Sequence, residues 1–332
     1  MDSNELLTRL KICCTATRKI LIYSLQFNHL MRKALKIYRT RHVFVQKIYV
    51  LSTIIMVLFS FPIISQIGSC TSIEKSIIYV SSLGTGNFTT IQDGIDAAHS
   101  GDTIFVYNGT YSENIVIDKS ITLLGENKNI TIIDGRGTGN VIKINADYVT
   151  IRGFTIQHSG LIFPNAGINC SANYTIIEEN FFNNNFYGMT LHRSSNNTII
   201  GNTIQNNDQC GIYMSRSSHN IIDTNIIRQN TYNGIGVYDS SNNNTIQSNT
   251  LTHNDYCGIN IRISSQNNII DNNISENNIG IHVPSSENTI IGNSLSNNNI
   301  DIDEELTTPG FELLLIIFSL VMVLFWKRKI VK

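Results

Sequence analysis

Charged residues are scarce in this chain, because they make up only 15% of its 332 residues and the formal net charge is −1. A chain with so little net charge has no overall field that would attract nucleic acid or an acidic partner. Its basic residues cluster only within the first 47 positions. Low charge combined with 42% hydrophobic residues also excludes an intrinsically disordered chain, which shows the opposite balance.

Cysteines with the spacing of a metal site or a redox site are absent. The chain contains no CxxC pair among its six cysteines, which are Cys13, Cys14, Cys70, Cys170, Cys210 and Cys257. So few cysteines in a chain of this length exclude a disulfide-stapled scaffold, and the lack of zinc-type spacing excludes a zinc module. The eight histidines are scattered through the sequence.

Long apolar runs occur only near the two ends. Residues 48–65 carry no charge and are about long enough to span a bilayer. Basic residues precede them, so the positive-inside rule places residues 1–47 in the cytoplasm, with Met31 as an alternative start. We interpret residues 48–69 as a signal peptide or a signal anchor, and residues 70–86 as a linker.

The second apolar run extends from Leu313 to Trp326 and is followed by three basic residues. These residues place the C-terminus in the cytoplasm as well, so the chain between the two runs is expected outside the cell. The order of Pro309, Gly310 and Phe311, a short apolar segment and a basic tail resembles the PGF-type sorting signal of archaeal cell-surface proteins.

This resemblance implies that an archaeosortase-type membrane protease processes the chain. Residues 309–332 would then form the sorting signal, and residues 303–308 a linker before it. Together with the charge asymmetry, the resemblance leads us to expect a protein at the extracellular face of the cell membrane.

Between the apolar runs, a repeat of about 23 residues is marked by glycines that lie 23, 23, 24 and 22 residues apart: Gly188, Gly211, Gly234, Gly258 and Gly280. A fixed period of this size indicates a repeat architecture. Apolar residues take the first and third positions after each glycine. This alternation predicts a short strand with one buried face, on which we place Ile212, Met214, Ile235, Val237, Ile259 and Ile261.

Each unit holds two further short apolar stretches, separated by serine pairs and asparagines. Three short strands per unit predict an all-β protein, a right-handed parallel β-helix, because coiling buries all three strands in one core. Asparagine tolerates the left-handed backbone that corners need, and its amide can stack on the next coil. One predicted ladder contains Asn202, Asn225, Asn249, Asn272 and Asn293. The other contains Asn207, Asn230, Asn254, Asn277 and Asn298.

The repeat also predicts the state of three cysteines. Cys210 and Cys257 both precede a repeat glycine, but Asn233 holds that position in the coil between them. Coils about 4.8 Å apart separate the two by about 9.6 Å, beyond the limit of about 7 Å for a disulfide. Both are therefore expected to be free thiols, and Cys170, which aligns with Met214, is expected to be buried.

The array begins with a stretch that predicts a capping helix. Thr90 and Asp93 approximate a capping box, while Ile91, Ile95 and Ala98 lie on one helical face. A short amphipathic helix here would cover the first coil, whose strand edges are otherwise unpaired.

The region from Phe88 to Gly135, which contains the pattern Gly109, Tyr111 and Glu113, resembles the N-terminal part of pectin-lyase-like β-helix proteins. The asparagine-rich coils that follow resemble the NosD-type repeat of the carbohydrate-binding and sugar-hydrolase group. Together the resemblance covers residues 87–302. It implies the fold and leaves the activity open, because this fold hosts many functions.

We assign no catalytic residue from the sequence. Glycoside hydrolysis needs two opposed carboxylates, and the catalytic motifs of pectin methylesterases and polygalacturonases have no counterpart here. The densest acidic groups, Glu178 with Glu179 and Asp301 with its neighbours, are expected to be solvated. A polysaccharide lyase, hydrolase or epimerase remains the alternative.

The NosD resemblance also implies an accessory role in copper-site maturation, which is a second alternative. His192, His219, His253 and His282 fall at different positions in their repeats. They do not form one column, and a metal site needs converging ligands. We therefore expect no metal and no other cofactor.

One flank of the repeat combines aromatic and arginine side chains, which suit the ring faces and hydroxyls of sugars. The candidate glycan-binding face consists of Arg193, Arg216, Tyr213, Tyr232, Tyr238, Tyr256 and Arg262. An ordinary β-helix flank would carry the same residue types, so this face is a hypothesis. We expect a binding or structural protein whose partner is an extracellular polysaccharide or a cell-surface glycan. Outside the cell, eight sequons become candidate N-glycosylation sites: Asn87, Asn108, Asn129, Asn169, Asn173, Asn196, Asn243 and Asn273.

Overall fold

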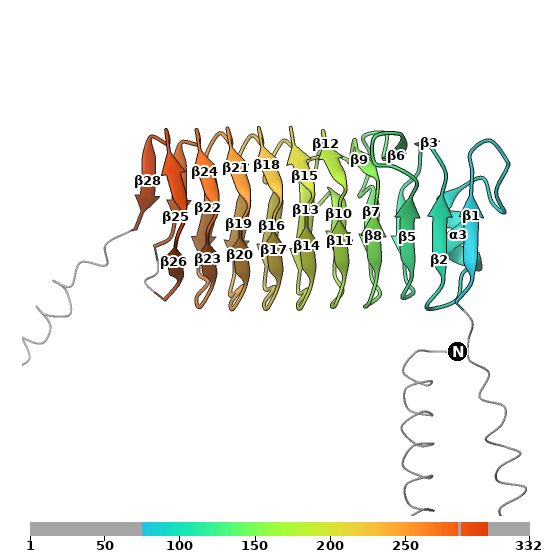
Figure 1. Ribbon diagram of the computed structural model, residues 1–332, viewed down its shortest axis with the longest axis horizontal. Coiled ribbons are helices and arrows are strands. Elements are labelled where there is room, and N and C mark those ends of the chain that lie inside the picture. Colours follow the sequence, from blue (N-terminus) through green and yellow to red (C-terminus); the bar gives the residue numbers. More distant parts are fainter. Residues whose placement is uncertain (1–74, 285–286, 305–332) are drawn as a thin grey trace, which may run out of the picture. The chain divides into compact units, whose positions relative to one another are not determined.

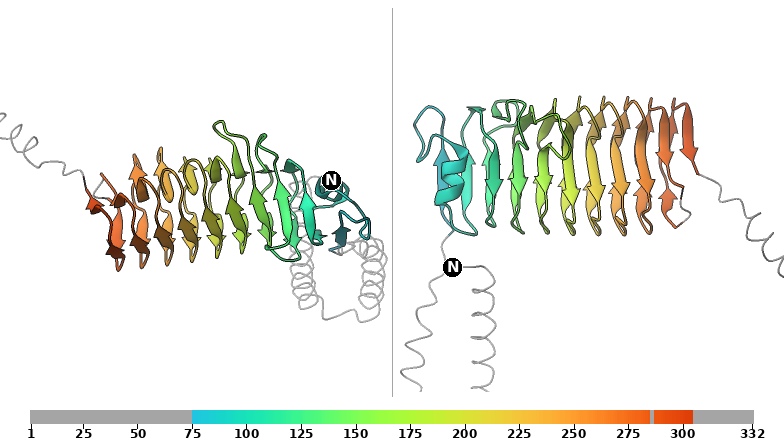
Figure 2. Two further views of the ribbon diagram at one scale, coloured as in Figure 1. Left: turned by 90° about the horizontal axis from the view of Figure 1, so that it is seen from above. Right: turned by 180° about the vertical axis from the view of Figure 1, so that it is seen from behind.

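The computed structural model describes residues 75–284 and 287–304. These residues form a right-handed parallel β-helix, as the repeat predicts. In Figure 1 the coils follow one another from the cyan end, with β1 (Ile77–Val80) and the helix α3 (Ile91–Ala97), to the red end at β28 (Ile300–Asp303). Each coil contributes one strand in turn to each of three parallel sheets, which the other views show as separate faces of the solenoid (Figure 2).

The first sheet has ten strands: β1 (Ile77–Val80), β2 (Thr103–Val106), β5 (Thr122–Gly125), β8 (Thr150–Arg152), β11 (Ile176–Glu178), β14 (Thr198–Ile200), β17 (Ile221–Asp223), β20 (Thr245–Gln247), β23 (Asn268–Ile270) and β26 (Thr289–Ile291). The second sheet has nine: β3 (Gly109–Tyr111), β6 (Thr131–Asp134), β9 (Thr155–Gln157), β12 (Phe181–Asn183), β15 (Thr203–Gln205), β18 (Ile226–Arg228), β21 (Thr250–Thr252), β24 (Asn273–Ser275) and β27 (Ser294–Ser296). The third sheet also has nine: β4 (Ile115–Ile117), β7 (Ile142–Ile144), β10 (Ala166–Cys170), β13 (Tyr187–His192), β16 (Ile212–Ser215), β19 (Ile235–Tyr238), β22 (Cys257–Arg262), β25 (Ile279–His282) and β28 (Ile300–Asp303).

The predicted register of the third sheet is confirmed. Ile212 pairs with Ile235, and Met214 pairs with Val237, in adjacent strands. All six residues assigned to the interior are fully buried. Beside them, a Cβ on Gly234 would lie 2.6 Å from a backbone oxygen of the next coil, so this position cannot hold a side chain without displacing that coil.

Both predicted asparagine ladders are present and carry continuous hydrogen bonds. The backbone N–H and the side-chain amide of Asn225 both donate to Asn249 Oδ1, at 2.9 and 3.0 Å. The same pattern runs through the second ladder, where Asn230 donates to Asn254. Each ladder begins one coil earlier than predicted, at Asn180 and Asn185.

One part of the ladder prediction is wrong. We expected the asparagines to supply the left-handed corners, but the left-handed residue is the one just before the ladder position. Thr224, with φ of 52°, precedes Asn225, and Ser248, with φ of 54°, precedes Asn249. The ladder asparagines therefore serve hydrogen bonding between coils, and the corner conformation is left to neighbours of many types.

The structure also contains a third asparagine ladder that the repeat analysis missed. It lies after the third sheet and runs through Asn197, Asn220, Asn244, Asn267 and Asn288. A serine ladder lies beside it, in which the Ser217 backbone N–H donates to Ser241 Oγ at 3.0 Å. From Asn180 onward, all three corners of each coil are thus tied to the next coil.

The predicted capping helix is α3 (Ile91–Ala97), and its apolar face is buried as expected. The hydroxyl of Thr90 accepts the N–H of Asp93 as the N-cap. Glu113, the acidic residue of the Gly109 pattern, accepts the N–H groups of Ile91 and Gln92 at 2.9 and 3.0 Å. A carboxylate there satisfies free amides and complements the helix dipole, so this pattern has a structural role.

The solenoid reaches beyond the predicted domain boundary at Asn87, because β1 pairs with β2 along its whole length. Within the described residues no helix is long and apolar enough to cross a membrane. Both predicted apolar runs, the sorting signal and Cys70 lie outside the described residues.

Candidate functional site

The outer face of the third sheet differs from an ordinary solvated strand surface. Its outward rows hold tyrosines in neighbouring coils, among them Tyr213 in β16 and Tyr238 in β19. Tyr213 lies opposite Gly236, and a Cβ at Gly236 would be 2.4 Å from the Tyr238 ring. The missing side chain therefore lets the Tyr238 ring fold back onto the sheet, where its hydroxyl accepts a hydrogen bond from Asn233 Nδ2 at 2.8 Å.

The aromatic rings on this face form a continuous row across coils. The ring centroids of Tyr187 and Tyr213 are 5.3 Å apart, and those of Tyr213 and Tyr238 are 5.2 Å apart. Phe163 stands over the first pair, at 6.1 Å from Tyr187 and 6.2 Å from Tyr213. Such spacings are typical of favourable aromatic contacts.

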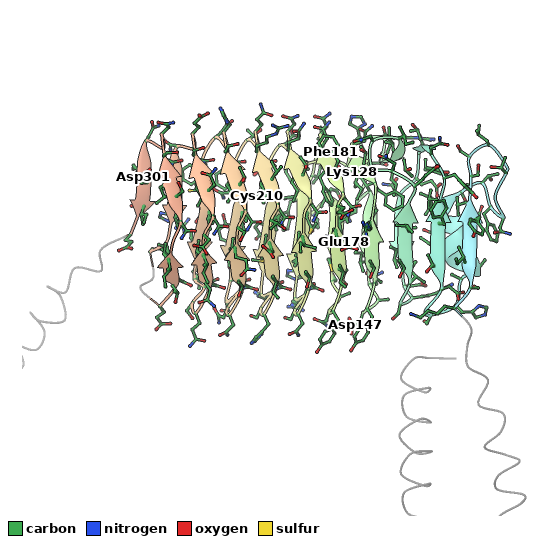
Figure 3. All side chains as sticks on the ribbon, in the orientation of Figure 1. Lys128, Asp147, Glu178, Phe181, Cys210 and Asp301 are labelled. Carbon is green, nitrogen blue, oxygen red and sulfur yellow. The ribbon has the colours of Figure 1, made fainter. Side chains whose placement is uncertain are left out.

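An open pocket of about 240 Å³ lies among these rings. Its lining combines aromatic, amide, thiol and carboxylate groups from Tyr187, Gln209, Cys210, Tyr213, Tyr232, Tyr238 and Asp239. Figure 3 places Cys210 on the strands in the middle of the solenoid, far from Asp301 at its end. Among these lining residues Asp239 is the one carboxylate.

Burial shapes the titration of this site. Desolvation raises the pKa of the Cys210 thiol to about 11, against the hydrogen bonds from Asn233. Desolvation also raises the pKa of Tyr187, Tyr213 and Tyr238. The thiol and the phenols are therefore neutral at physiological pH, so the pocket offers hydroxyl groups and ring faces and not reactive anions.

The predicted glycan-binding residues divide into two groups. Tyr213, Tyr232 and Tyr238 meet in the pocket, and Tyr256 adjoins it by stacking on Tyr232 with centroids 5.1 Å apart and planes 4° from parallel. The three arginines are exposed and are not among the lining residues.

The position of the arginines follows from the corner geometry. Arg193 and Arg216 have left-handed φ values of 52° and 53° at the corner that follows the third sheet. Arg262 pairs with Tyr238 in register, so it lies one position before that corner. The arginines thus edge the third sheet on the side away from the loop that carries Phe163.

Sequence reasoning missed Tyr187 and Phe163. Tyr187 directly precedes Gly188, a position that holds Cys210 and Cys257 in later coils, and only the cysteines drew attention to that column. Phe163 belongs to residues 158–165, which connect β9 to β10 and which we call the β9–β10 loop. Its signal was the apolar run at residues 161–163 outside the repeat period.

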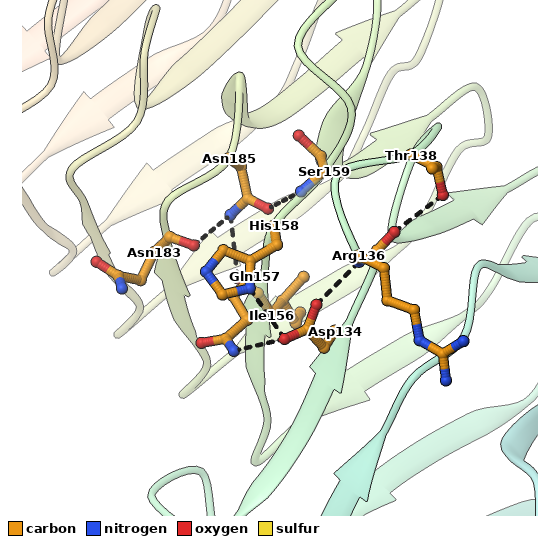
Figure 4. A network of polar contacts seen from close by, with 10 residues as sticks. Asp134, Arg136, Thr138, Ile156, Gln157, His158, Ser159, Asn183 and Asn185 are labelled. Atoms are coloured by element: carbon orange, nitrogen blue, oxygen red, sulfur yellow. Dashed lines mark hydrogen bonds and ion pairs between the residues drawn. The ribbon is translucent and has the colours of Figure 1, made fainter.

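A polar network fixes the base of the β9–β10 loop (Figure 4). Asp134 Oδ2 is 2.9 Å from both Gln157 Nε2 and His158 Nδ1, while Asp134 Oδ1 accepts the Arg136 N–H at 2.9 Å. Burial would raise the pKa of Asp134, but these hydrogen bonds outweigh it and hold the pKa below its ordinary value. The Ser159 N–H donates to Asn185 Oδ1 at 3.1 Å, which joins the loop to the start of the second ladder.

A second, larger pocket of about 490 Å³ lies at the corner between the second and third sheets. It is lined by polar groups and contains no Phe, Tyr or Trp: His253, Asn254, Asp255, Glu276, Asn277, Asn278, Asn297 and Asn299. Glu276 forms an ion pair with His253. The other acidic residues considered earlier are engaged elsewhere, since Arg152 pairs with Glu178 and Glu179 at 3.7 and 2.7 Å.

The described residues do not provide an obvious copper site. They contain no group of three or more His, Cys, Asp or Glu side chains that could hold a metal ion. Cys170, Cys210 and Cys257 are buried free thiols, as predicted, and desolvation raises their pKa, which disfavours the thiolate that metals bind. His282 instead pairs with Asp303 at 2.9 Å. The donor set in this part of the chain therefore does not fit copper.

The sequons differ in accessibility. Asn169 is buried and its side chain donates to the carbonyl of Pro164, so the folded chain cannot present it for glycosylation. Asn173 is half-buried. The remaining sequon asparagines are exposed: Asn87, Asn108, Asn129, Asn196, Asn243 and Asn273.

Comparison with solved structures shows the same fold. The catalytic domain of a GH87 α-1,3-glucanase in complex with tetrasaccharides superposes with a TM-score of 0.56 at 17% identity, covering 69% of this chain and 45% of that one. The catalytic unit of the GH87 α-1,3-glucanase from Streptomyces thermodiastaticus gives 0.50 at 15% identity, covering 62% and 43%. The A-module of a mannuronan C-5 epimerase from Azotobacter vinelandii gives 0.46 at 17% identity, covering 63% and 70%. The chain thus spans less than half of the glucanase domains.

No curated protein is significantly similar to this chain in sequence. The profile of one family, described as periplasmic copper-binding protein (NosD), matches residues 95–310. This match covers most of the solenoid, including every coil that forms the aromatic row. The chain belongs to the NosD family.

Proposed function

We propose that this protein is a non-catalytic glycan-binding β-helix protein, anchored in the cell membrane with its solenoid outside the cell. The observation that carries the proposal is the aromatic pocket on the outer face of the third sheet. Tyrosine rings offer flat apolar surfaces for the faces of sugar rings, while Gln209, Asp239 and the phenol groups offer partners for sugar hydroxyls.

Buried polar atoms without hydrogen-bond partners lower the stability of this face, and this supports a functional role. Thr190, opposite Tyr213, and Asn260, opposite Gly236, are both buried on the outer face, and each has a side-chain oxygen without a hydrogen-bond partner. Burying one such atom costs about 1–3 kcal/mol. Two of the four such atoms among the described residues lie on this face, and a local loss of stability of this kind is typical of functional sites.

A binding role also agrees better with the carboxylates than an enzymatic one. Hydrolysis and general acid–base catalysis need a paired acid and base, and Asp239 is the single carboxylate in the described lining of the aromatic pocket. The GH87 structures act on or bind α-glucans, but at 15–17% identity they carry only the fold to this chain. A polysaccharide-modifying enzyme remains the rival, and its acid and base would come from Asp255 and Glu276 in the corner pocket.

Copper delivery is the second rival, because it follows from the family description. Its ligands would have to come from outside the described residues or from a partner. The proposed location rests on the sequence: the two apolar runs, the basic residues that flank them and the PGF-type signal at Pro309, Gly310 and Phe311. An archaeosortase-type enzyme would be the processing partner.

The test uses the full chain in detergent and a glycan array, followed by titration with the best ligand in the presence and absence of copper. Tyr232→Ala should weaken binding several-fold, because it removes a stacked ring from the pocket. Tyr148→Ala is the matched control: Tyr148 stacks on Tyr174 at 4.9 Å and 6°, almost the same geometry, but it lies outside the pocket, at the corner that follows β7.

An equal loss of glycan affinity in both variants, or no loss in either, would show that the binding site is not the aromatic pocket on the third sheet. Release of new reducing ends or unsaturated sugars from the bound polymer would show that the protein is a polysaccharide-modifying enzyme and not a non-catalytic binding protein. Glycan binding that appears only in the presence of copper would favour the copper-related function.

A further inference from the structure

The β9–β10 loop exposes three large apolar residues in succession. Leu161, Ile162 and Phe163 are 64%, 74% and 60% exposed. The corresponding connection in the next coil, between β12 and β13, needs only residues 184–186. The additional residues of the β9–β10 loop therefore are not required to turn the corner, and they do not enlarge the core.

The loop is held in this position by hydrogen bonds at its base. Ser159 is buried, and its hydroxyl accepts the Phe186 N–H at 2.9 Å. The Gly160 N–H donates to the carbonyl of Gly139 at 2.8 Å. With the Asp134 network beneath it (Figure 4), the loop presents its apolar tip as a fixed feature. In Figure 2 the green part of the solenoid carries loops that project beyond its faces.

The surroundings of the tip have the charge pattern of a membrane-contacting surface. Residues 159–170 contain no charged residue. Arg136 and Lys143, both exposed, flank the loop: Arg136 follows Asp134 in the basal network, and Lys143 pairs in register with Asn169, whose amide donates to Pro164. Figure 4 shows the Arg136 side chain extending away from the network. Exposed apolar side chains with basic residues beside them suit an anionic bilayer surface.

The lengths of the connecting segments bring a bilayer within reach. Nine residues, 66–74, separate the N-terminal apolar run from the described solenoid, and eight residues, 305–312, separate the solenoid from the second apolar run at Leu313. At about 3.6 Å per residue, nine residues span at most about 32 Å. If both runs lie in the membrane, these lengths allow either end of the solenoid to lie close to the membrane surface.

We infer that the β9–β10 loop inserts Leu161 and Ile162 into the interfacial region of the bilayer. This inference rests on the membrane location in the proposed function. Phe163, the third residue of the tip, contacts Tyr187 and Tyr213. The insertion would therefore orient the aromatic pocket toward glycans that are displayed at the membrane.

The experiment places a fluorescent reporter at the tip of the full-length chain in vesicles. Leu161→Trp is made in a Trp326→Phe background, because Trp326 is the only tryptophan. Ile176→Trp is the control: Ile176 is also exposed, but it lies in β11 of the first sheet, across the solenoid from the loop. We expect blue-shifted emission for Leu161→Trp and loss of its intensity with brominated lipids, more so in anionic than in neutral vesicles, and neither effect for Ile176→Trp.

Alkaline extraction of the same vesicles reports separately whether the chain is anchored, so failure of the proposed location is distinguishable from failure of the loop. Unquenched, water-like emission from Leu161→Trp would overturn the inference. Blue-shifted emission that bromolipids do not quench would place the loop against protein and would also overturn it. Quenching of an extractable chain would still support insertion of the loop.

Discussion

Replacing one ladder asparagine tests whether the fold depends on hydrogen bonds between coils as much as on its apolar core. Asn249 is fully buried and connects three consecutive coils. Its Oδ1 accepts the backbone N–H and the side-chain amide of Asn225 at 2.9 and 3.0 Å. Its Nδ2 donates to the carbonyls of Ile222 and Gln247 at 2.9 Å, and to Asn272 Oδ1 at 3.0 Å.

Asn249→Ala removes all these side-chain contacts at once. The Asn225 N–H is then buried without an acceptor, which costs about 1–3 kcal/mol, and each further lost hydrogen bond adds about 1 kcal/mol where no other partner replaces it. We expect a loss of about 2–4 kcal/mol in the free energy of unfolding. This is a large share of the 5–15 kcal/mol that is typical of a folded domain.

Urea unfolding of the full chain, followed by far-UV circular dichroism, measures the loss as a lower midpoint. Asn273→Ala is the matched control, because Asn273 is an exposed asparagine in β24. Asn249→Asp gives a second readout. Its carboxylate can still accept from Asn225 but faces the oxygens of Ile222 and Asn272, so burial and repulsion raise its pKa in the folded state. The destabilisation should then shrink as the pH falls through that raised pKa. If Asn249→Ala unfolds at the same urea concentration as Asn273→Ala, the ladders do not stabilise the coils as argued.

Three further predictions follow from the described residues. Ile235→Asp should unfold neighbouring coils and lower the melting temperature strongly, since an unpaired charge in the core costs several kcal/mol; an unchanged melting curve would refute the register. Cys210 and Cys257, whose pKa values burial raises to about 11 and about 12, should react with iodoacetamide at pH 8 at least about a hundredfold more slowly in the folded than in the urea-unfolded chain; rapid labelling, or a crosslink between them detected by mass spectrometry, would contradict this. Glu113→Gln should lower the free energy of unfolding by about 1 kcal/mol without changing glycan binding, because it removes the charge and one of two acceptors at the start of α3; the urea midpoint and a binding titration check both parts.

The interior of this protein could be predicted because it depends on local alternation repeated at one period. An apolar residue at Ile212 or Ile235 has one way to face the core once the strand is placed, and a spacing of 23 residues places the next strand. The free thiols followed from the same spacing. The left-handed corners did not follow, because any residue with an outward side chain can take them, as Thr224 and Arg216 do.

The candidate site was harder to predict, because it depends on where single side chains fold back. Three of its tyrosines were named from the flank pattern, but the pocket exists because Gly236 leaves room for the Tyr238 ring. Tyr187 joins it through its contact with Tyr213, and Phe163 of the β9–β10 loop packs against both rings. The repeat period predicts which face of a strand a residue occupies. The contacts of a loop that departs from the period are known only from the three-dimensional structure.

The contrast between the inner and outer rows of the third sheet also refines the proposed ligand. The inner row is nearly uniform, but the outer row changes at every coil: Lys143, Asn169, Thr190, Tyr213, Gly236, Asn260 and His282. A glycan that extends along the solenoid therefore does not meet the same contact in each coil. From Tyr187 to Tyr238 the row covers two coil steps, or about 10 Å at about 4.8 Å per step.

Affinity should consequently rise with oligosaccharide length only until the ligand spans this aromatic stretch, and should then level off. Calorimetric titration of the full chain with oligosaccharides of increasing length measures the length at which the affinity stops rising. Continued growth of affinity with length would mean that repeated contacts along the whole solenoid dominate, as in a multivalent surface. In that case the aromatic row would not be the main determinant of binding, because a ligand confined to it gains nothing from sugars beyond the Tyr238 coil.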